Sequence, residues 1–253
     1  FTIDYRKIER AITEKTTCIL ATHVFGNTCD IEEIDRIAKK YKLKVIYDAA
    51  HCFGVTYKND SIFNYGDVST CSFHSTKLFH SGEGGAVFCK DASLLNRLFY
   101  HHNFGHKGKE DFQGIGINAK MSELQAALGL AVLPYIDQIM TSRHEAVAYY
   151  NQLFENTLIK RIKIRRETNW NYSYYPIVFD KESQLLTVVK ALNSQDIYPR
   201  RYFRPSLETL PYVKASVLLQ STSISKRVLC LPLFHDITYD SIQKITDIIK
   251  AHI

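Results

Sequence analysis

The chain has 253 residues, 45% of them hydrophobic, so it can bury the core of one large α/β domain or of a larger and a smaller one. Its formal net charge of +6 is scattered along the chain, and such a balance suits an anionic small substrate as well as nucleic acid. Because no apolar stretch approaches the length of a membrane span and no charged-then-apolar leader opens the chain, we expect neither insertion nor export. The 6 cysteines include no CxxC pair, and we expect free thiols in a reducing cytoplasm.

The first elements are a strand and a helix, followed by a second strand. An apolar run over Cys18 to Val24 predicts the first strand. The helix that follows begins at Asp30, where Glu33 three residues later suggests a capping box. The run from Lys44 to Ala50 predicts the next strand, and an acid, Asp48, stands near its carboxyl end. In a parallel sheet this end faces the ligand crevice.

A lysine loop joins the next two strands. The apolar and β-branched run VSTCSF, residues 68–73, leads into STKLFHSGEGG, and the strand AVFC follows. Lys77 therefore lies where a buried sheet meets a loop, which is where α/β enzymes keep their chemistry. We expect a helix over Ala92 to His101 and then a glycine-bearing loop from Asn103 to Asn118.

The remaining chain predicts a long helix and a smaller domain. The text from Met121 onward is helical in character, with a break or kink at Pro134. A short strand at 174–178, a helix at 181–192 and a last helix at 239–253 follow. The pattern predicts an α/β fold: a mostly parallel sheet with flanking helices in a large domain, residues 1–135, and a smaller C-terminal α+β domain, residues 136–253.

Lys77 has the surroundings of a cofactor-binding lysine. A partly desolvated amine has a lowered pKa and can form a Schiff base with a carbonyl, most commonly that of pyridoxal 5'-phosphate. This cofactor needs a carboxylate at its ring nitrogen, a phosphate donor and a contact for its ring, and Asp48, Ser72 and His51 suit these tasks. Each residue alone also has a plain reading: a solvated lysine, an acid that caps backbone groups, or a satisfied half-buried histidine.

The combination resembles a known family, the sugar-nucleotide aminotransferases of the DegT/DnrJ/EryC1/StrS group within the aspartate aminotransferase superfamily. The matching segments are ATHVFGNTCDIEEI, VIYDAAHCFG, YGDVSTCSFHSTKLFHSGEGGAVF and GINAKMSELQAALG, and weaker similarity continues through VLCLPLF. The resemblance implies a PLP-dependent transferase-like large domain. It places Lys77 on the Schiff-base lysine, Asp48 on the pyridine-nitrogen carboxylate, His51 on the ring-contacting position and Ser72 on a phosphate-binding hydroxyl.

The resemblance also implies an assembly. Asn118 matches an asparagine that reaches the cofactor phosphate of the neighbouring subunit, so a homodimer with shared active sites is expected. The plain alternative for Asn118 is a loop residue that caps the helix near Met121. For Gly82, Gly84 and Gly85 the plain alternative is a turn before a strand, and the functional one adds close backbone approach to a ligand.

The activity that the resemblance implies is a transamination with L-glutamate as amino donor and a nucleotide-linked keto-deoxysugar as acceptor. Lys77 distinguishes this group from sugar-dehydratase relatives, which carry a histidine at that position. The text FHSTKLFHSGEGG looks closer to enzymes that aminate C4 of dTDP-4-keto-6-deoxyglucose than to C3 aminotransferases. Tyr202 or Arg201 could contact the nucleotide-sugar, whereas Arg204 stands where an aromatic residue is commoner.

Other functions remain open at this point. The text FTIDYRKIERAI begins within a strand-to-helix passage, and we expect that roughly a hundred residues precede it in the family. Were they truly absent, the chain would be a truncated, non-catalytic paralogue that acts as a dimerising module. A basic protein that binds nucleic acid or polysaccharide is favoured only by charge and tyrosine content, because the chain has no basic stripe, RNA-binding aromatic signature or zinc pattern.

Overall fold

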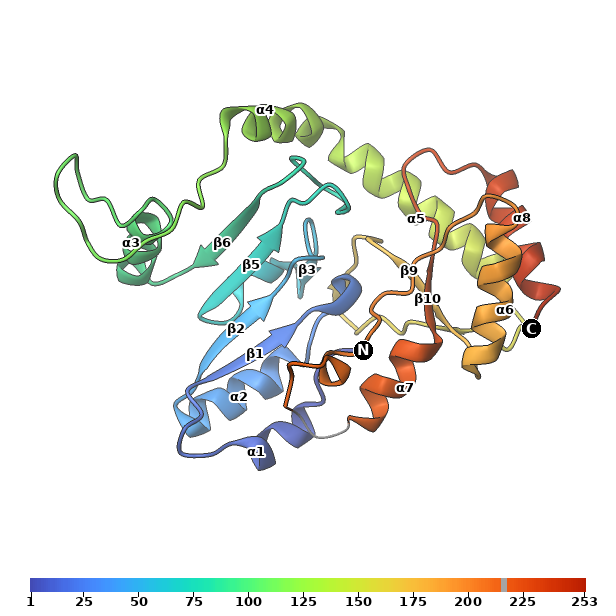
Figure 1. The fold of residues 1–253 in the computed structure, drawn as a ribbon, viewed down its shortest axis with the longest axis horizontal. Coiled ribbons are helices and arrows are strands. Elements are labelled where there is room, and N and C mark those ends of the chain that lie inside the picture. The colour runs from blue at the N-terminus through green and yellow to red at the C-terminus, as the bar shows by residue number, and fades with distance from the viewer. Residues whose placement is uncertain (215–217) are drawn as a thin grey trace. The chain divides into compact units, whose positions relative to one another are not determined.

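A computed structural model describes residues 1–214 and 218–253 (Figure 1). The chain forms 2 compact units, Phe1–Asp137 with Ile164–Asn171, and Gln138–Lys163 with Tyr172–Ile253. The first unit thus contains a short segment from the later part of the chain, residues 164–171, which we call the strap. The expected division into domains at residues 135 and 136 stays a prediction.

The first unit is built on a four-stranded sheet of order β1-β2-β5-β6, whose strands lie side by side in Figure 1. The strands are β1 (Cys18–Thr22), β2 (Lys44–Asp48), β5 (Val68–Ser72) and β6 (Gly85–Cys89). The first three are parallel, and β6 runs antiparallel to β5. Because the segment between β5 and β6 holds no helix to cross the sheet, the two strands form a hairpin. The expected mostly parallel α/β sheet is confirmed.

Helix α2 (Ile31–Tyr41) covers the sheet through its apolar face, formed by Ile31, Ile34, Ile37 and Ala38, all buried. The expected start of this helix is correct, but the capping box is not. Asp30 is the N-cap residue and makes no side-chain capping bond. Its carboxylate instead accepts two hydrogen bonds from the guanidinium of Arg165 in the strap. A charge-assisted bidentate pair is stronger than a single bond to a backbone N–H.

The other elements of the first unit are short. They are α1 (Ile8–Ala11), α3 (Ala92–His101), α4 (Glu123–Val132) and a small antiparallel sheet of β4 (Asp60–Ser61), β3 (Thr56–Tyr57) and the strap strand β8 (Thr168–Asn169). The range expected for α3 is confirmed. Pro134 lies in a 3-10 turn, Leu133–Tyr135, that separates α4 from α5 (Ile136–Leu153), so the expected break is also confirmed.

Within its described residues, the second unit has a small antiparallel sheet and four α-helices. The sheet has the order β10-β9-β7, from Val228–Leu231, Tyr175–Val178 and Lys160–Arg161. Beside most of α5 the unit contains α6 (Glu182–Asn193), α7 (Leu219–Arg227) and α8 (Tyr239–Lys250). Arg143 of α5 is buried, and its guanidinium donates to the main-chain oxygens of Tyr172, Ser173 and Leu233. One cation thereby satisfies three carbonyl groups from two segments of this unit.

The six cysteines are free thiols, as expected. In the part of the chain that the structure describes, no helix combines the length and the apolar character that a bilayer crossing needs.

Candidate active site

The lysine loop, residues 73–84, is a closed hairpin loop. Its ends are joined by hydrogen bonds from the Phe73 amide to the Gly84 oxygen (2.8 Å) and from the Ser81 amide to the Phe73 oxygen (2.9 Å). Further in, the Ser75 amide donates to the Gly82 oxygen at 2.7 Å. These bonds fix the loop that carries Lys77 to the ends of β5 and β6.

The glycines of this loop are explained by the turn itself. Gly82 has φ of 78° and Gly84 φ of 156°, conformations that residues with side chains rarely adopt. A Cβ on Gly84 would lie 2.5 Å from Ser81 Oγ and 2.7 Å from Met121 Cε. The third glycine, Gly85, begins β6, where a Cβ would lie 2.8 Å from the Cys71 carbonyl oxygen. The plain reading of these glycines therefore accounts for them, without a ligand.

Asp48 and Lys77 lie within electrostatic reach of each other. Asp48 ends β2, and its Oδ1 accepts a hydrogen bond from the Ala50 amide at 3.0 Å. Lys77 is half-buried, and burial lowers the pKa of its amine, although the charges of Asp48 and Cys71 oppose part of this effect. A lysine with a lowered pKa has a larger neutral, nucleophilic fraction at pH 7.

His51 belongs to the same group. It is 8% exposed, and burial lowers the pKa of its ring to about 3, with a smaller contribution from the charge of Lys77. Its Nδ1 accepts a hydrogen bond from the Phe25 amide at 3.0 Å. The ring is therefore neutral at physiological pH, and its proton is on Nε2. Asp48, His51 and Lys77 are thus brought together by the ends of β2 and β5, as the sequence predicts.

Ser72 ends β5 and reaches the lysine loop. Asp48 pairs in register with Thr70, two residues before Ser72, so these residues share one end of adjacent strands. The Ser72 hydroxyl oxygen accepts a hydrogen bond from the His74 amide at 3.3 Å. Since the hydroxyl still has its own proton to donate, Ser72 keeps the capacity to bind a phosphate oxygen.

Asn118 is placed differently. It lies exposed in the loop before α4, pairs with Asn103 as an isolated bridge, and accepts a hydrogen bond from Lys120 Nζ at 2.6 Å. The plain alternative, that Asn118 caps the following helix, is wrong: Ser122 is the N-cap of α4 and forms a capping box with Gln125. The role predicted for Asn118 concerns a neighbouring subunit and is not tested by a single chain.

The sequence does not mark a further set of contacts in the loop, which joins His74 to Thr76 and to Glu83. His74 Nδ1 lies 2.8 Å from the Thr76 hydroxyl and accepts from the Thr76 amide at 3.2 Å. Its Nε2 faces the Glu83 carboxylate at 3.5 Å. This bonding supports the turn directly before Lys77. The letters HST and GEGG give no sign of it, because the pairing depends on the closed shape of the loop.

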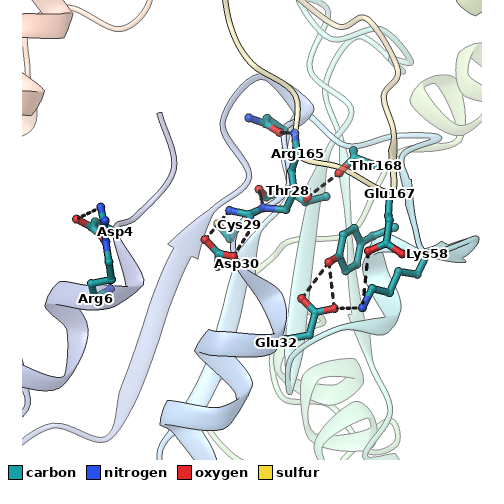
Figure 2. Close-up of polar contacts among 12 residues, drawn as sticks. Asp4, Arg6, Thr28, Cys29, Asp30, Glu32, Lys58, Arg165, Glu167 and Thr168 are labelled. Carbon is teal, nitrogen blue, oxygen red and sulfur yellow. Dashed lines mark hydrogen bonds and ion pairs between the residues drawn. The ribbon is translucent and has the colours of Figure 1, made fainter.

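The strap contacts the rest of the first unit through polar bonds with α2 and with the segment before α2 (Figure 2). Arg165 Nε donates to the Thr28 oxygen at 3.1 Å, in addition to the bonds with Asp30. The hydroxyls of Thr28 and Thr168 lie 2.7 Å apart. The strap therefore supports the start of α2, and no sequence motif marks it.

In the second unit, the residues expected to face a sugar contact other residues of the same unit. Arg201 donates to the Glu182 carboxylate at 2.7 Å, and Arg204 bonds the same carboxylate. Tyr202 accepts a hydrogen bond from Arg200 at 3.0 Å and stacks on Phe203 at 4.8 Å. Their predicted contact with a nucleotide-sugar stays a prediction.

The first-unit group fits pyridoxal phosphate chemically. It has a half-buried amine of lowered pKa, a carboxylate within electrostatic reach, a buried neutral imidazole and a hydroxyl at the neighbouring strand end. These are a Schiff-base former, a partner for a protonated ring nitrogen, a ring contact and a phosphate donor.

The fold is that of solved sugar aminotransferases. A structure described as DesI in the presence of its TDP-sugar product matches with a TM-score of 0.90 and 27% identity, over 99% of this chain and 66% of that one. The fold is also that of the PLP form of Spr1654, a putative sugar aminotransferase from Streptococcus pneumoniae, with a TM-score of 0.91 at 20% identity, over 100% of this chain and 73% of that one. The class is thus a PLP-dependent transferase fold.

The chain belongs to the DegT/DnrJ/EryC1/StrS aminotransferase family, whose model matches residues 1–250. A dTDP-4-amino-4,6-dideoxy-D-glucose transaminase from Shigella dysenteriae is 36% identical over 97% of this chain and 69% of its own length. The transaminase of the same name from Escherichia coli is 37% identical over 98% and 70%. A dTDP-3-amino-3,6-dideoxy-alpha-D-galactopyranose transaminase from Aneurinibacillus thermoaerophilus is 39% identical over 63% and 44%.

Proposed function

We propose that this protein transfers the amino group of L-glutamate to the keto carbon of a nucleotide-linked deoxysugar, with dTDP-4-keto-6-deoxyglucose as substrate and C4 as the aminated carbon. The cofactor is pyridoxal 5'-phosphate bound at Lys77. The product serves the synthesis of deoxysugars or surface polysaccharides. With six free thiols, the protein suits a reducing cytoplasm.

The observation that carries the proposal is the group of Lys77, Asp48 and His51 in a chain that matches two dTDP-4-amino-4,6-dideoxy-D-glucose transaminases over nearly its full length. Neither part suffices alone. A half-buried lysine beside an acid also occurs in structural ion pairs. Relatives at this level of identity establish a family. Whether a member keeps the family's chemistry depends on its site residues.

Each residue has a task in this proposal. Pyridoxal phosphate supplies an electron sink for the charge that develops when the donor loses its Cα proton. With the cofactor bound, the amine of Lys77 would move a proton between the donor's Cα and C4′ of the cofactor. The carboxylate of Asp48 holds a proton at the ring nitrogen, His51 contacts the ring, and the hydroxyl of Ser72 donates to the phosphate.

The test is a visible absorbance spectrum of the full-length protein after addition of pyridoxal phosphate and removal of the excess. We expect a yellow band that L-glutamate bleaches and that the Lys77→Ala variant lacks. Lys15→Ala is the matched control, because Lys15 is an exposed lysine in the turn before β1. A spectrum without a Lys77-dependent band would overturn the aminotransferase and favour a non-catalytic, dimerising protein.

Amination of C3 is the second candidate, and the relative from Aneurinibacillus thermoaerophilus is the observation in its favour. The two candidates differ in the position of the new C–N bond. Incubation with the 3-keto and 4-keto sugar nucleotides, followed by proton NMR of the products, assigns this position. A product aminated only at C3 would replace the C4 proposal.

A homodimer with shared sites completes the proposal. Exposed apolar side chains gather on the loop before α4 and on α4 itself: Ile115, Ile117, Met121, Leu124, Leu128 and Leu130. An apolar patch of this kind on a free monomer is unfavourable in water and suits a second copy. If Asn118 serves the partner's site, a mixture of Lys77→Ala and Asn118→Ala protomers regains activity that neither variant has alone. Absence of any regain in mixed dimers would place Asn118 outside the partner's site.

A further inference from the structure

Phe25 has an uncommon backbone conformation beside the candidate site. Its φ of 59° and ψ of 20° lie in the left-handed region, which a bulky residue seldom occupies, and its side chain is 2% exposed. Gly26 follows with φ of 79°, and a Cβ at that position would lie 2.7 Å from Asn171 Oδ1. The chain turns sharply here, directly after β1, and the surrounding contacts hold the turn.

Those contacts join Phe25 to His51 on one side and to the strap on the other. The Phe25 amide donates to His51 Nδ1 at 3.0 Å, and the Phe25 carbonyl oxygen accepts from Trp170 Nε1 at 2.7 Å. The rings of Phe25 and His51 stack with centroids 6.2 Å apart and an angle of 12°. Asn171 Nδ2 donates to the His51 and Phe53 carbonyl oxygens, each at 2.8 Å.

This arrangement fixes both the plane and the tautomer of the His51 ring. The stacked Phe25 ring sets the plane. The amide proton aimed at Nδ1 requires a lone pair there, so the neutral ring carries its proton on Nε2. The indole of Trp170 holds the Phe25 carbonyl group, so the peptide units before and after the Phe25 Cα are each fixed by one hydrogen bond. An amide that could turn away would release Nδ1.

We infer that Phe25 and Trp170 are positioning residues: together they hold His51 as the Nε2–H tautomer, in one ring plane, for the cofactor ring bound at Lys77. This inference rests on the proposed function for the identity of the cofactor. It goes beyond it by giving the strap a task, because Trp170 belongs to a segment far from Lys77 in the sequence. A plain packing role would need the bulk of the indole but not its N–H.

The experiment uses this difference. In the full-length, deuterated, 15N-labelled protein without cofactor, we expect a 15N–15N coupling across the hydrogen bond from the Phe25 amide to His51 Nδ1. Trp170→Phe keeps an aromatic ring and removes the N–H, and it should abolish this coupling. Tyr57→Phe is the matched control, since it removes a donor to Glu32 elsewhere in the same unit. No coupling in the unmodified protein, or an undiminished coupling in Trp170→Phe, would overturn the inference.

A second variant, Phe25→Gly, distinguishes the contribution of the Phe25 amide from that of the Phe25 side chain. It also provides a test if Trp170→Phe does not fold. Glycine adopts the left-handed conformation readily, so Phe25→Gly should keep the coupling and lose the stacked ring. If Trp170→Phe does not fold, a Phe25→Gly protein that binds pyridoxal phosphate as tightly as the unmodified protein would contradict the inference on its own, because the stacked ring would then have no positioning role.

The final measurement concerns the cofactor. Loss of one such hydrogen bond should weaken pyridoxal phosphate binding to Trp170→Phe by about threefold to tenfold, with Tyr57→Phe unchanged. Equal affinity in all three proteins, with the coupling lost in Trp170→Phe, would show that the contacts of Phe25 and Trp170 with His51 do not serve the cofactor. This result would overturn the positioning role. If the unmodified protein binds no pyridoxal phosphate, the proposed function fails. The coupling would still show whether Phe25 and Trp170 hold His51.

Discussion

Among the charged groups that act on Lys77, the carboxylate of Asp48 has the largest effect. Replacing it by the neutral Asp48→Asn removes the partner of a protonated cofactor nitrogen and leaves the shape of the site. We expect the half-reaction with L-glutamate to slow on the order of a hundredfold to a thousandfold, measured by stopped-flow bleaching of the cofactor band. Asp111→Asn, in an exposed loop, is the control. Equal rates in both variants would remove Asp48 from the mechanism.

Gly84 tests whether the lysine loop tolerates a side chain. Because an added Cβ would lie 2.5 Å from Ser81 Oγ at a φ of 156°, Gly84→Ala forces the loop to move. We expect a loss of about 1–3 kcal/mol in the free energy of unfolding, measured by urea denaturation. Gly108→Ala, where a Cβ meets nothing within 4 Å, should change it by less than about 0.5 kcal/mol. Similar losses in both variants would contradict this steric account.

The site residues show which information the sequence contains. The sequence predicts Asp48, His51, Ser72 and Lys77 as one group, because each lies at or just beyond the carboxyl end of a strand. Phe25 could not be predicted, since nothing in HVFGN requires a left-handed phenylalanine. Its conformation, worth about 1–3 kcal/mol of strain, persists because His51 binds the Phe25 amide and the strap binds the Phe25 carbonyl group.

At the scale of elements, Arg165 contributes the charged contact that holds the strap to the start of α2. Its bidentate pair with Asp30 is about three-quarters buried on each side, at 28% and 26% exposure. Arg165→Ala leaves the Asp30 carboxylate without this partner, and we expect a loss of about 2 kcal/mol in the free energy of unfolding. Figure 2 also shows the control, the pair of Arg6 with Asp4, in which Arg6 is 73% exposed. Arg6→Ala should cause no measurable change, and equal effects would contradict the structural role of the strap.

Elements with local signals are predicted well, and those built by distant contacts are not. Helix α2 follows from the spacing of Ile31, Ile34 and Ile37, and the turn before β6 follows from its glycines. The capping box at Asp30 fails because Arg165, 135 positions later, takes the carboxylate. The strap has neither a helical nor a strand period, so its place depends on partners that a local pattern does not contain.

At the scale of the whole molecule, the stability of the first unit depends on pH through its buried histidines. The first unit buries two histidines, His23 and His51, at 0% and 8% exposure. Burial lowers the pKa of each ring from 6.5 to about 3, aided at His51 by the charge of Lys77. Between these pH values the unfolded chain binds a proton at each ring and the folded unit does not. The stability is therefore complete above about pH 6.5 and falls as the pH is lowered toward 3.

The expected slope is about 1.4 kcal/mol per pH unit for each histidine between roughly pH 6 and pH 4. Trp170 is the only tryptophan of the chain and lies in the first unit, so urea unfolding followed by its fluorescence reports this unit directly. His51→Gln should reduce the slope by the share of one histidine, whereas His252→Gln, at the exposed C-terminus, should not reduce it. A His51→Gln protein with the unmodified slope would mean that His51 takes up its proton in the folded state, and the neutral ring on which the site depends would be wrong.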